Sequence, residues 1–221
     1  INPNTKAILP VHYSGDVGSL EEVYKIALSK GLRVIEDAAH AFGSKFKGEL
    51  VGSFGDTACF SFDGIKNITS GEGGCVVSSD EKLLKKVEDA RLLGVVSDTK
   101  NRFDGKRSWN FDVHYQGWRY HMSNIMAAIG KEQFLKSKKF FKQRQKLAKH
   151  YDKKFLQNRN LEIFKRDYNS IVPHIYVIKL KNNTNRQILR ENLLKNGIET
   201  GMHYQPNHLL KLYNKKNNRL K

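Results

Sequence analysis

A strand, a helix and a second strand follow one another at the start of the chain, and this order constrains the fold most. The apolar run at residues 7–12 predicts a buried strand, and residues 33–36 predict another that ends at Asp37. Between them, residues 19–22 (SLEE) form a capping box that begins a helix, and Gly31 ends it. The apolar face of this helix consists of Val23, Ile26, Ala27 and Leu28. Such a unit is typical of a parallel sheet, so an α/β fold is expected.

Further strands are expected at residues 57–62 and 74–78, and the loop between them carries Lys66. Asp80 can cap a helix that reaches about Leu92. A sheet with mainly parallel strands is therefore expected to form the first part of the chain.

The middle of the chain changes character. Residues 94–116 are polar and irregular, which predicts a long loop with a functional or interfacial role. Ser123 can cap a long helix over residues 124–149. Beyond it, a strand, a helix and a strand are predicted at residues 172–180, 185–196 and 198–200. We therefore expect part of a large domain at residues 1–134 and part of a smaller α+β domain at residues 135–221.

The net charge of +17 is unevenly distributed. Residues 1–134 hold 17 basic and 17 acidic side chains, whereas residues 135–221 hold 22 basic and 5 acidic ones. A solvated lysine-rich surface is the expected explanation, with attraction of a phosphorylated small molecule as a milder alternative. A nucleic-acid binder stays open as a third reading, but no aromatic stacking motif accompanies the basic residues. No nucleic-acid or membrane partner is expected.

Localisation is inferred from what the chain lacks. There is no run of 18 apolar residues and no signal peptide at the start of the sequence. Cys59 and Cys75 lie in neighbouring predicted strands and have no metal-ligand spacing, so two buried, reduced thiols are expected. We expect a cytoplasmic protein without a metal site.

Two polar clusters at strand ends suggest an aldehyde cofactor. Asp37 follows one apolar run, and Lys66 follows another and precedes the glycine-rich turn at residues 71–74. In open parallel sheets, ligands bind beyond the carboxyl ends of strands. A lysine amine there can form a Schiff base, and a carboxylate can pair with a pyridinium nitrogen. Taken alone, each has a plainer reading: Asp37 as a turn or cap residue, Lys66 as a solvated lysine.

Three neighbours fit the same site. In an extended segment Asp37 and Ala39 point the same way, so the Ala39 methyl group can contact the face of a ring. His40 can donate to a phenolic oxygen or stack near the ring, although a structural histidine is the plainer reading. Ser61 ends a strand and offers a hydroxyl group to a phosphate.

These residues carry a resemblance to the DegT/DnrJ/EryC1/StrS sugar aminotransferase family. The matching segments cover most of the chain: VIEDAAHA at 34–41, GSFGD at 52–56, FSF at 60–62, KNITSGEGG at 66–74, GWRYHMSNI at 117–125, GIET at 197–200 and HYQPNH at 203–208. The resemblance implies fold type I, the aspartate-aminotransferase-like fold. It also implies pyridoxal 5′-phosphate as the cofactor.

The resemblance implies roles for single residues. Lys66 matches the lysine that forms the Schiff base, and Asp37 matches the acid on the pyridine nitrogen. His40 matches a position beside the ring oxygen, and Ser61 matches a hydroxyl on the cofactor phosphate. Arg119 replaces an asparagine that, in many members, reaches the phosphate in the other subunit of a homodimer.

The implied reaction transfers an amino group, with glutamate as the expected donor, to a keto carbon of a nucleotide-linked deoxysugar, for polysaccharide, lipopolysaccharide or related amino-sugar biosynthesis. His203 is expected to face the sugar. Relatives that carry His in place of the lysine are dehydratases or deoxygenating enzymes, so Lys66 favours transamination. Family members are longer, and a phosphate-binding loop that precedes the matching region has no counterpart here. A fragment is therefore expected, and a catalytically inactive remnant that acts only with a partner chain is the alternative.

Overall fold

The computed structural model describes residues 1–106, 111–181 and 185–213. By internal contacts the chain divides into two compact units. The first comprises Ile1–Gln157 with Ile163–Ile178, and the second comprises Asn158–Glu162 with Lys179–Lys221. In the part of the chain that is described, no helix is both long and apolar enough to cross a membrane.

The secondary structure is mixed throughout. The strands are β1 (Ala7–Ile8), β2 (Arg33–Asp37), β3 (Lys45–Phe46), β4 (Glu49–Leu50), β5 (Thr57–Ser61), β6 (Gly74–Ser78), β7 (Leu161–Ile163) and β8 (Ile178–Leu180). The α-helices are α1 (Leu20–Lys30), α2 (Glu81–Ala90), α3 (Asp98–Phe103), α4 (Asn124–Phe155) and α5 (Arg186–Lys195). Two short 3₁₀ helices, η1 (Tyr13–Gly15) and η2 (Asn207–Leu209), complete the set.

A four-stranded sheet in the order β1-β2-β5-β6 forms the centre of the first unit. Strands β1, β2 and β5 are parallel, and β6 runs antiparallel to β5. The register places Asp37 beside Cys59 and Ser61 beside Gly74. This mixed, mostly parallel sheet agrees with the α/β class expected from the βαβ order.

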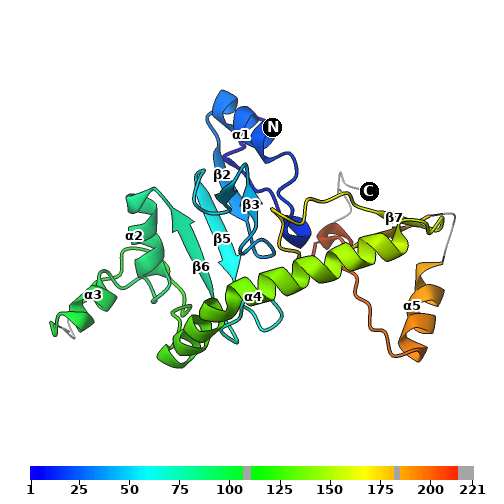
Figure 1. Cartoon of the computed structure of the whole chain (residues 1–221). Coiled ribbons are helices and arrows are strands. Elements are labelled where there is room, and N and C mark those ends of the chain that lie inside the picture. The colour runs from blue at the N-terminus through cyan, green and yellow to red at the C-terminus, as the bar shows by residue number, and fades with distance from the viewer. Residues whose placement is uncertain (107–110, 182–184, 214–221) are drawn as a thin grey trace. The chain divides into compact units, whose positions relative to one another are not determined.

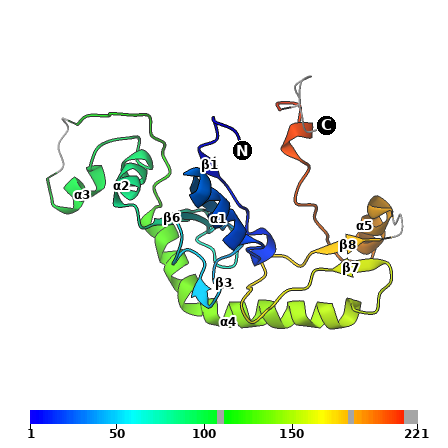
Figure 2. The same cartoon turned by 90° about the horizontal axis from the view of Figure 1, so that it is seen from above.

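Helices lie against both ends of this sheet. α1 contacts β1 and β2, and α2 lies beside β6 (Figures 1 and 2). As predicted, Gly31 ends α1 in the left-handed conformation, at φ 61°. Asp80 caps α2 through a hydrogen bond from the Leu83 amide. Ser19 precedes α1 but makes no side-chain cap bond, so the expected capping box does not form.

The core lies on the sheet face that carries Ala58 and Phe60. Its buried members are Ala38, Ala41, Val51, Ala58 and Phe60. Phe42 packs edge to face against Phe60 at a centroid distance of 5.6 Å. Phe134 and Phe141 of α4 also contact the Phe42 ring. The contact with α4 is close, because a Cβ on Gly43 would lie 2.4 Å from the Phe141 ring.

α4 runs for 32 residues along the loop that follows β5 (Figure 1). Ser123 caps it as predicted, with Oγ accepting from the Met126 amide at 3.3 Å. The helix continues past the expected end to Phe155. The domain boundary expected at residue 134 would fall inside it.

Four expectations about secondary structure were wrong. The first strand is only Ala7–Ile8 and is not buried, because Pro10 cannot donate to a ladder and, among the described residues, no strand pairs with the other side of β1. Residues 94–116 contain the short helix α3 where a continuous loop was expected, and residues 107–110 lie outside the described range. The strand expected at residues 172–180 is reduced to β8, and residues 198–200 form no strand.

Two expectations about burial also need correction. Leu28, assigned to the inner face of α1, is 85% exposed, and Leu20 and Ala27 are the buried members. Cys59 and Cys75 are unbridged, as expected, but are half-buried rather than buried. Burial raises the pKa of both thiols.

Candidate active site

Asp37 is the last residue of β2, at the carboxyl end of the strand. Its main chain is held on both sides, because its amide donates to Pro10 O at 2.9 Å and its carbonyl accepts from the His12 amide at 3.0 Å. One carboxylate oxygen, Oδ1, accepts from the Ala39 amide at 3.1 Å. The turn that follows therefore departs from the extended segment on which the contact of Ala39 with a ring was predicted.

The other oxygen of Asp37 accepts no hydrogen bond, and no cation pairs with the carboxylate, within the described part of the chain. The side chain is half-buried. Its charge is felt by Cys59, whose thiol pKa is raised first by burial and then by Asp37. A half-buried carboxylate without a cation can bind a protonated ring nitrogen.

Ser61 shares a sheet face with Asp37. Paired residues in a ladder point to the same side, so Asp37 and Cys59 share a face, and Ser61 lies two residues further along β5 on that face. The rise of a strand separates Cys59 from Ser61 by about 6.6 Å. Ser61 Oγ accepts from the Asp63 amide at 3.3 Å, which leaves its hydroxyl hydrogen to donate.

Lys66 lies in the loop after β5, at the sheet edge where Asp37 ends β2. The loop is anchored on both sides of the lysine: the Lys66 amide donates to Asp63 O at 3.0 Å, and Arg144 Nη2 reaches Lys66 O at 3.5 Å. The lysine side chain is half-buried, and its ammonium makes no ion pair with any residue that the structure describes. Gly71 and Gly73 after it have φ values of 83° and 151°, as the glycine-rich turn predicted.

Asn67 and Arg144 support this loop and were not identified from the sequence. Asn67 is buried, and its Nδ2 donates to Phe42 O at 3.0 Å and to Val172 O at 3.3 Å. Arg144 also donates to His174 O at 2.9 Å. Asn67 lies in the KNITSGEGG motif, so the motif signalled it. Arg144 lies within a lysine-rich helix, and nothing in its spacing distinguishes it.

His40 follows Asp37 by three residues and lies in the turn. Its Nδ1 accepts from the Ser14 amide at 3.3 Å. A neutral imidazole that accepts at Nδ1 carries its hydrogen on Nε2. Its ring is 4.3 Å from the ring of His174, centroid to centroid. His40 is therefore oriented by its neighbours.

A buried cluster behind Asp37 was also missed. Glu36 points to the opposite face of β2 and is fully buried, as is His12. Glu36 Oε2 lies 2.6 Å from His12 Nε2, and Glu36 Oε1 accepts from Tyr24 Oη at 2.5 Å. Tyr24 Oη in turn accepts from the Asp56 amide at 3.1 Å. The sequence did contain a signal for this cluster. Glu36 is a carboxylate inside an apolar run, and a buried charge needs partners.

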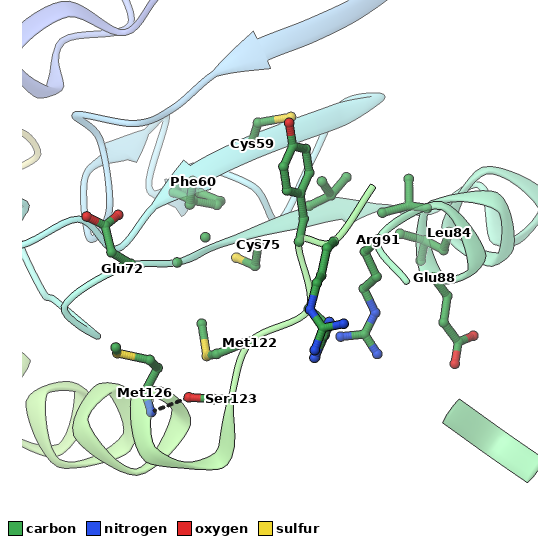
Figure 3. Close-up of a pocket in the computed structure, with 17 residues that line it drawn as sticks. Cys59, Phe60, Glu72, Cys75, Leu84, Glu88, Arg91, Met122, Ser123 and Met126 are labelled. Atoms are coloured by element: carbon green, nitrogen blue, oxygen red, sulfur yellow. Dashed lines mark hydrogen bonds between the residues drawn. The ribbon is translucent and has the colours of Figure 1, made fainter. Parts of the chain in front are cut away.

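Arg119 lies beyond β6, where it pairs with Leu92 in an isolated antiparallel bridge. It lines a pocket of about 960 Å³ that also contains Cys59 and Gly74, the strand partners of Asp37 and Ser61. Figure 3 shows Met122 and Met126 near the start of α4 and Arg91 directly after α2. Asp37, Ser61 and Lys66 do not line this pocket.

His203 belongs to the second unit, in the segment between α5 and η2. Its ring contacts that of Tyr204, with centroids 4.7 Å apart. The structure thus brings Asp37, Ala39, His40, Ser61 and Lys66 to one edge of the sheet and puts Arg119 on a pocket beyond it. His203 is described only within its own unit.

The residues at the sheet edge fit pyridoxal phosphate. Among the residues that the structure describes, the carboxylate of Asp37 has an oxygen left for a cation, the amine of Lys66 has no counter-ion, and Ser61 keeps a donor for phosphate oxygens. These three chemistries are the ones that the ring nitrogen, the aldehyde and the phosphate of that cofactor require.

The chain matches the model of the DegT/DnrJ/EryC1/StrS aminotransferase family over residues 1–221. It is 34% identical over 212 residues to a UDP-4-amino-4,6-dideoxy-N-acetyl-beta-L-altrosamine transaminase of Campylobacter jejuni, with 95% of this chain and 54% of the relative covered.

Two solved structures share the fold. PseC of Helicobacter pylori, an aminotransferase of pseudoaminic acid biosynthesis, matches with a TM-score of 0.86 and 30% identity, covering 96% of this chain and 56% of PseC. The PLP form of Spr1654 from Streptococcus pneumoniae matches with a TM-score of 0.83 and 26% identity, covering 97% of this chain and 58% of Spr1654.

The chain thus spans little more than half the length of the relatives that it matches. The matches confirm the expected α/β fold of type I. The chain belongs to the DegT/DnrJ/EryC1/StrS aminotransferase family, whose members are pyridoxal-phosphate-dependent sugar aminotransferases.

Proposed function

We propose that the protein to which this chain belongs transfers an amino group to a keto carbon of a nucleotide-linked deoxysugar, with pyridoxal phosphate as cofactor and glutamate as donor. One observation carries the proposal. Asp37 and Lys66, which pair with no opposite charge among the described residues, lie at the same edge of a mostly parallel sheet, where ligands of such sheets bind.

Bound pyridoxal phosphate supplies an electron sink for the carbanion at the substrate carbon. Asp37 keeps a negative charge at the ring nitrogen and so favours its protonated form. Lys66 would hold the cofactor aldehyde through Nζ, and the same amine would carry a proton to and from the substrate carbon. The hydrogen bonds to the Lys66 main chain limit where Nζ can move.

Neighbouring side chains position the cofactor. His40 would lie beside the ring oxygen, and Ser61, whose Oγ accepts from the Asp63 amide, would donate its hydroxyl hydrogen to the phosphate. Ala39 presents a small methyl group near the ring. Because Ala39 lies in a turn that Asp37 itself closes, the two residues are fixed relative to each other.

The remaining assignments depend on a second subunit or on the second unit of this chain. Arg119 contacts the phosphate of a homodimer partner's cofactor, with a bidentate guanidinium in place of an amide. His203 contacts the sugar. The Campylobacter relative named above is a transaminase of a UDP-linked sugar, which supports a nucleotide sugar as substrate. We also propose a role in cell-surface polysaccharide or lipopolysaccharide synthesis. We place the reaction in the cytoplasm.

The first test is covalent attachment of the cofactor. The purified chain is mixed with pyridoxal phosphate, its visible spectrum is recorded, and the mixture is reduced with borohydride and digested. We expect a visible band and one modified peptide that contains Lys66. Lys66→Arg should lose both, whereas Lys45→Arg, an exposed lysine nearby, should keep both.

The second test is amino transfer. The chain loaded with cofactor is given isotopically labelled glutamate and a UDP-linked 4-keto-deoxysugar, and label in the sugar is measured. Label in the product, absent in Lys66→Arg, supports the proposal. A band at saturating cofactor without transfer would favour the remnant alternative, in which an intact partner chain is needed. The absence of any band at saturating cofactor contradicts the proposal for this chain.

A further inference from the structure

The outer face of α4 is a continuous lysine surface. Between residues 131 and 154 the helix carries nine lysines, all exposed: Lys131, Lys136, Lys138, Lys139, Lys142, Lys146, Lys149, Lys153 and Lys154. At 100° per residue they all fall within an arc of roughly 160°, and along the axis they extend over about 35 Å. This set is called the lysine face below. All of α4 belongs to the first unit, and Figure 1 draws it as one continuous helix.

The opposite side of α4 is the one that packs. Ser137 and Ala148 are buried, and Phe141 lies against Phe42. The lysines therefore point away from the core because the hydrophobic period of the helix assigns the inner positions to other residues. Their gathering on one side is a consequence of the fold that composition alone did not show.

Little neutralises this charge. Glu132 is the one acidic side chain on the same arc, since Asp152 points inward and accepts from Tyr176 Oη at 2.7 Å. None of the nine lysines makes an ion pair with a residue that the structure describes, and Lys149 Nζ donates to the neutral Asn169 at 2.9 Å. Like charges three and four positions apart, as at Lys138, Lys142 and Lys146, destabilise a helix. A bound anionic surface would relieve that repulsion.

We propose that the lysine face docks this protein on membranes rich in anionic phospholipids. Clusters of four to eight basic residues on one helix face bind anionic lipid headgroups. The nine lysines extend over about 35 Å of the helix axis, so the lysine face can contact an anionic membrane surface at several points.

A leucine within the lysine face strengthens the choice of lipid. Leu135 is 68% exposed, and its helix neighbours at i−4, i+3 and i+4 are Lys131, Lys138 and Lys139. An apolar side chain among lysines can enter the headgroup boundary of a bilayer, as in interfacial helices, but gains nothing against phosphates of a nucleic-acid backbone. The proposal revises the expectation of no membrane partner, and it does not depend on the proposed reaction.

The test is co-sedimentation of the full chain with phosphatidylcholine vesicles that contain or lack phosphatidylglycerol, at several salt concentrations. We expect binding only to the anionic vesicles, weakening as salt rises. Each basic residue near such a surface contributes roughly fivefold to partitioning, so Lys139→Gln/Lys142→Gln/Lys146→Gln should lower it about a hundredfold. Glutamine preserves helix propensity, and circular dichroism checks that the variant is folded.

The matched control removes the same charge elsewhere. Lys30, Lys82 and Lys86 are exposed lysines on α1 and α2, and their triple Gln variant should bind the vesicles within a few-fold of the wild type. Leu135→Gln should weaken vesicle binding several-fold and leave binding to duplex DNA unchanged.

Three results overturn the proposal. These are equal binding to vesicles with and without phosphatidylglycerol, an equal loss in the control triple variant, and displacement of the wild type from the vesicles by duplex DNA at matched phosphate concentration. The first and third use the wild type alone, so the proposal stays testable even if the triple variant does not fold.

Discussion

The buried cluster behind Asp37 yields a sharp prediction about stability. Glu36 is fully buried immediately before Asp37, and two side chains satisfy its carboxylate: His12 and Tyr24. His12→Ala removes the partner at 2.6 Å and leaves a buried carboxylate with the tyrosine hydroxyl alone.

The magnitude follows from the burial. Removing one partner of a buried charged pair costs about 3–5 kcal/mol, because the remaining charge has lost its compensation without regaining water. For a protein of 221 residues, this cost corresponds to a fall in Tm of roughly 6–20 °C. The loss should be recovered in part when Glu36 is made neutral, since the amide of Glu36→Gln has a smaller desolvation penalty.

The assay is urea unfolding followed by circular dichroism, for the wild type, His12→Ala, Glu36→Gln and the double variant. We expect the double variant to be more stable than the sum of the two single effects predicts, by about 1–3 kcal/mol. His114→Ala serves as the control, because His114 is an exposed histidine that contacts Asp112 at 3.1 Å. The His114→Ala substitution should lower the free energy of unfolding by less than about 1 kcal/mol.

Additivity in this cycle would refute the reasoning, since it would mean that His12 and Glu36 do not interact across their short contact. So would a cost for His12→Ala no larger than that for His114→Ala. Either result would assign the stability of this region to apolar packing alone.

Two further predictions concern the carboxylates and caps of the first unit. The Arg33 guanidinium contacts Asp56 at 2.5 Å and lowers the pKa of the Asp56 carboxyl group in the folded state. The ionised carboxylate therefore stabilises the folded protein at neutral pH, and this stabilisation is lost as the pH falls from about 4 through the folded-state pKa. The stability difference between wild type and Asp56→Asn, from urea midpoints, should therefore shrink below about pH 4, and a difference that stays constant would contradict this. Ser123→Ala should destabilise the protein by about 0.5–2 kcal/mol because it removes the N-cap hydrogen bond of α4. Ser19→Ala should cost less, because Ser19 makes no cap bond to α1. Equal falls in Tm for the two variants would contradict the assignment of Ser123 as an N-cap.

Local signals predicted the elements that begin or end on a specific side chain. Asp80 and Ser123 cap α2 and α4, and Gly31 ends α1, because capping depends on the few residues beside the helix end. The strand expected at residues 172–180 failed for a different reason. Val172 is buried, but its amide donates to Ser44 Oγ rather than to a neighbouring strand. An apolar run indicates that a segment is buried, but only the tertiary structure determines which groups form hydrogen bonds with its backbone.

The candidate site shows the same division. Asp37 and Lys66 could be found from strand ends and a glycine-rich turn, and the family resemblance covers both positions. Asn67 and Arg144, which hold the Lys66 loop in place, act through contacts with residues 25 to 105 positions away in sequence. No local pattern encodes partners at that distance.

By itself the sequence determined the α/β class, the family and the residue types at the sheet edge, because periodicity, caps and motifs are properties of neighbouring residues. Only the tertiary structure decided that Glu36 is sealed behind Asp37 with His12 and Tyr24, and that the side of α4 opposite its lysines packs against the first unit. Both depend on which face of a strand or helix meets the core, and that choice is made by long-range packing rather than by local sequence.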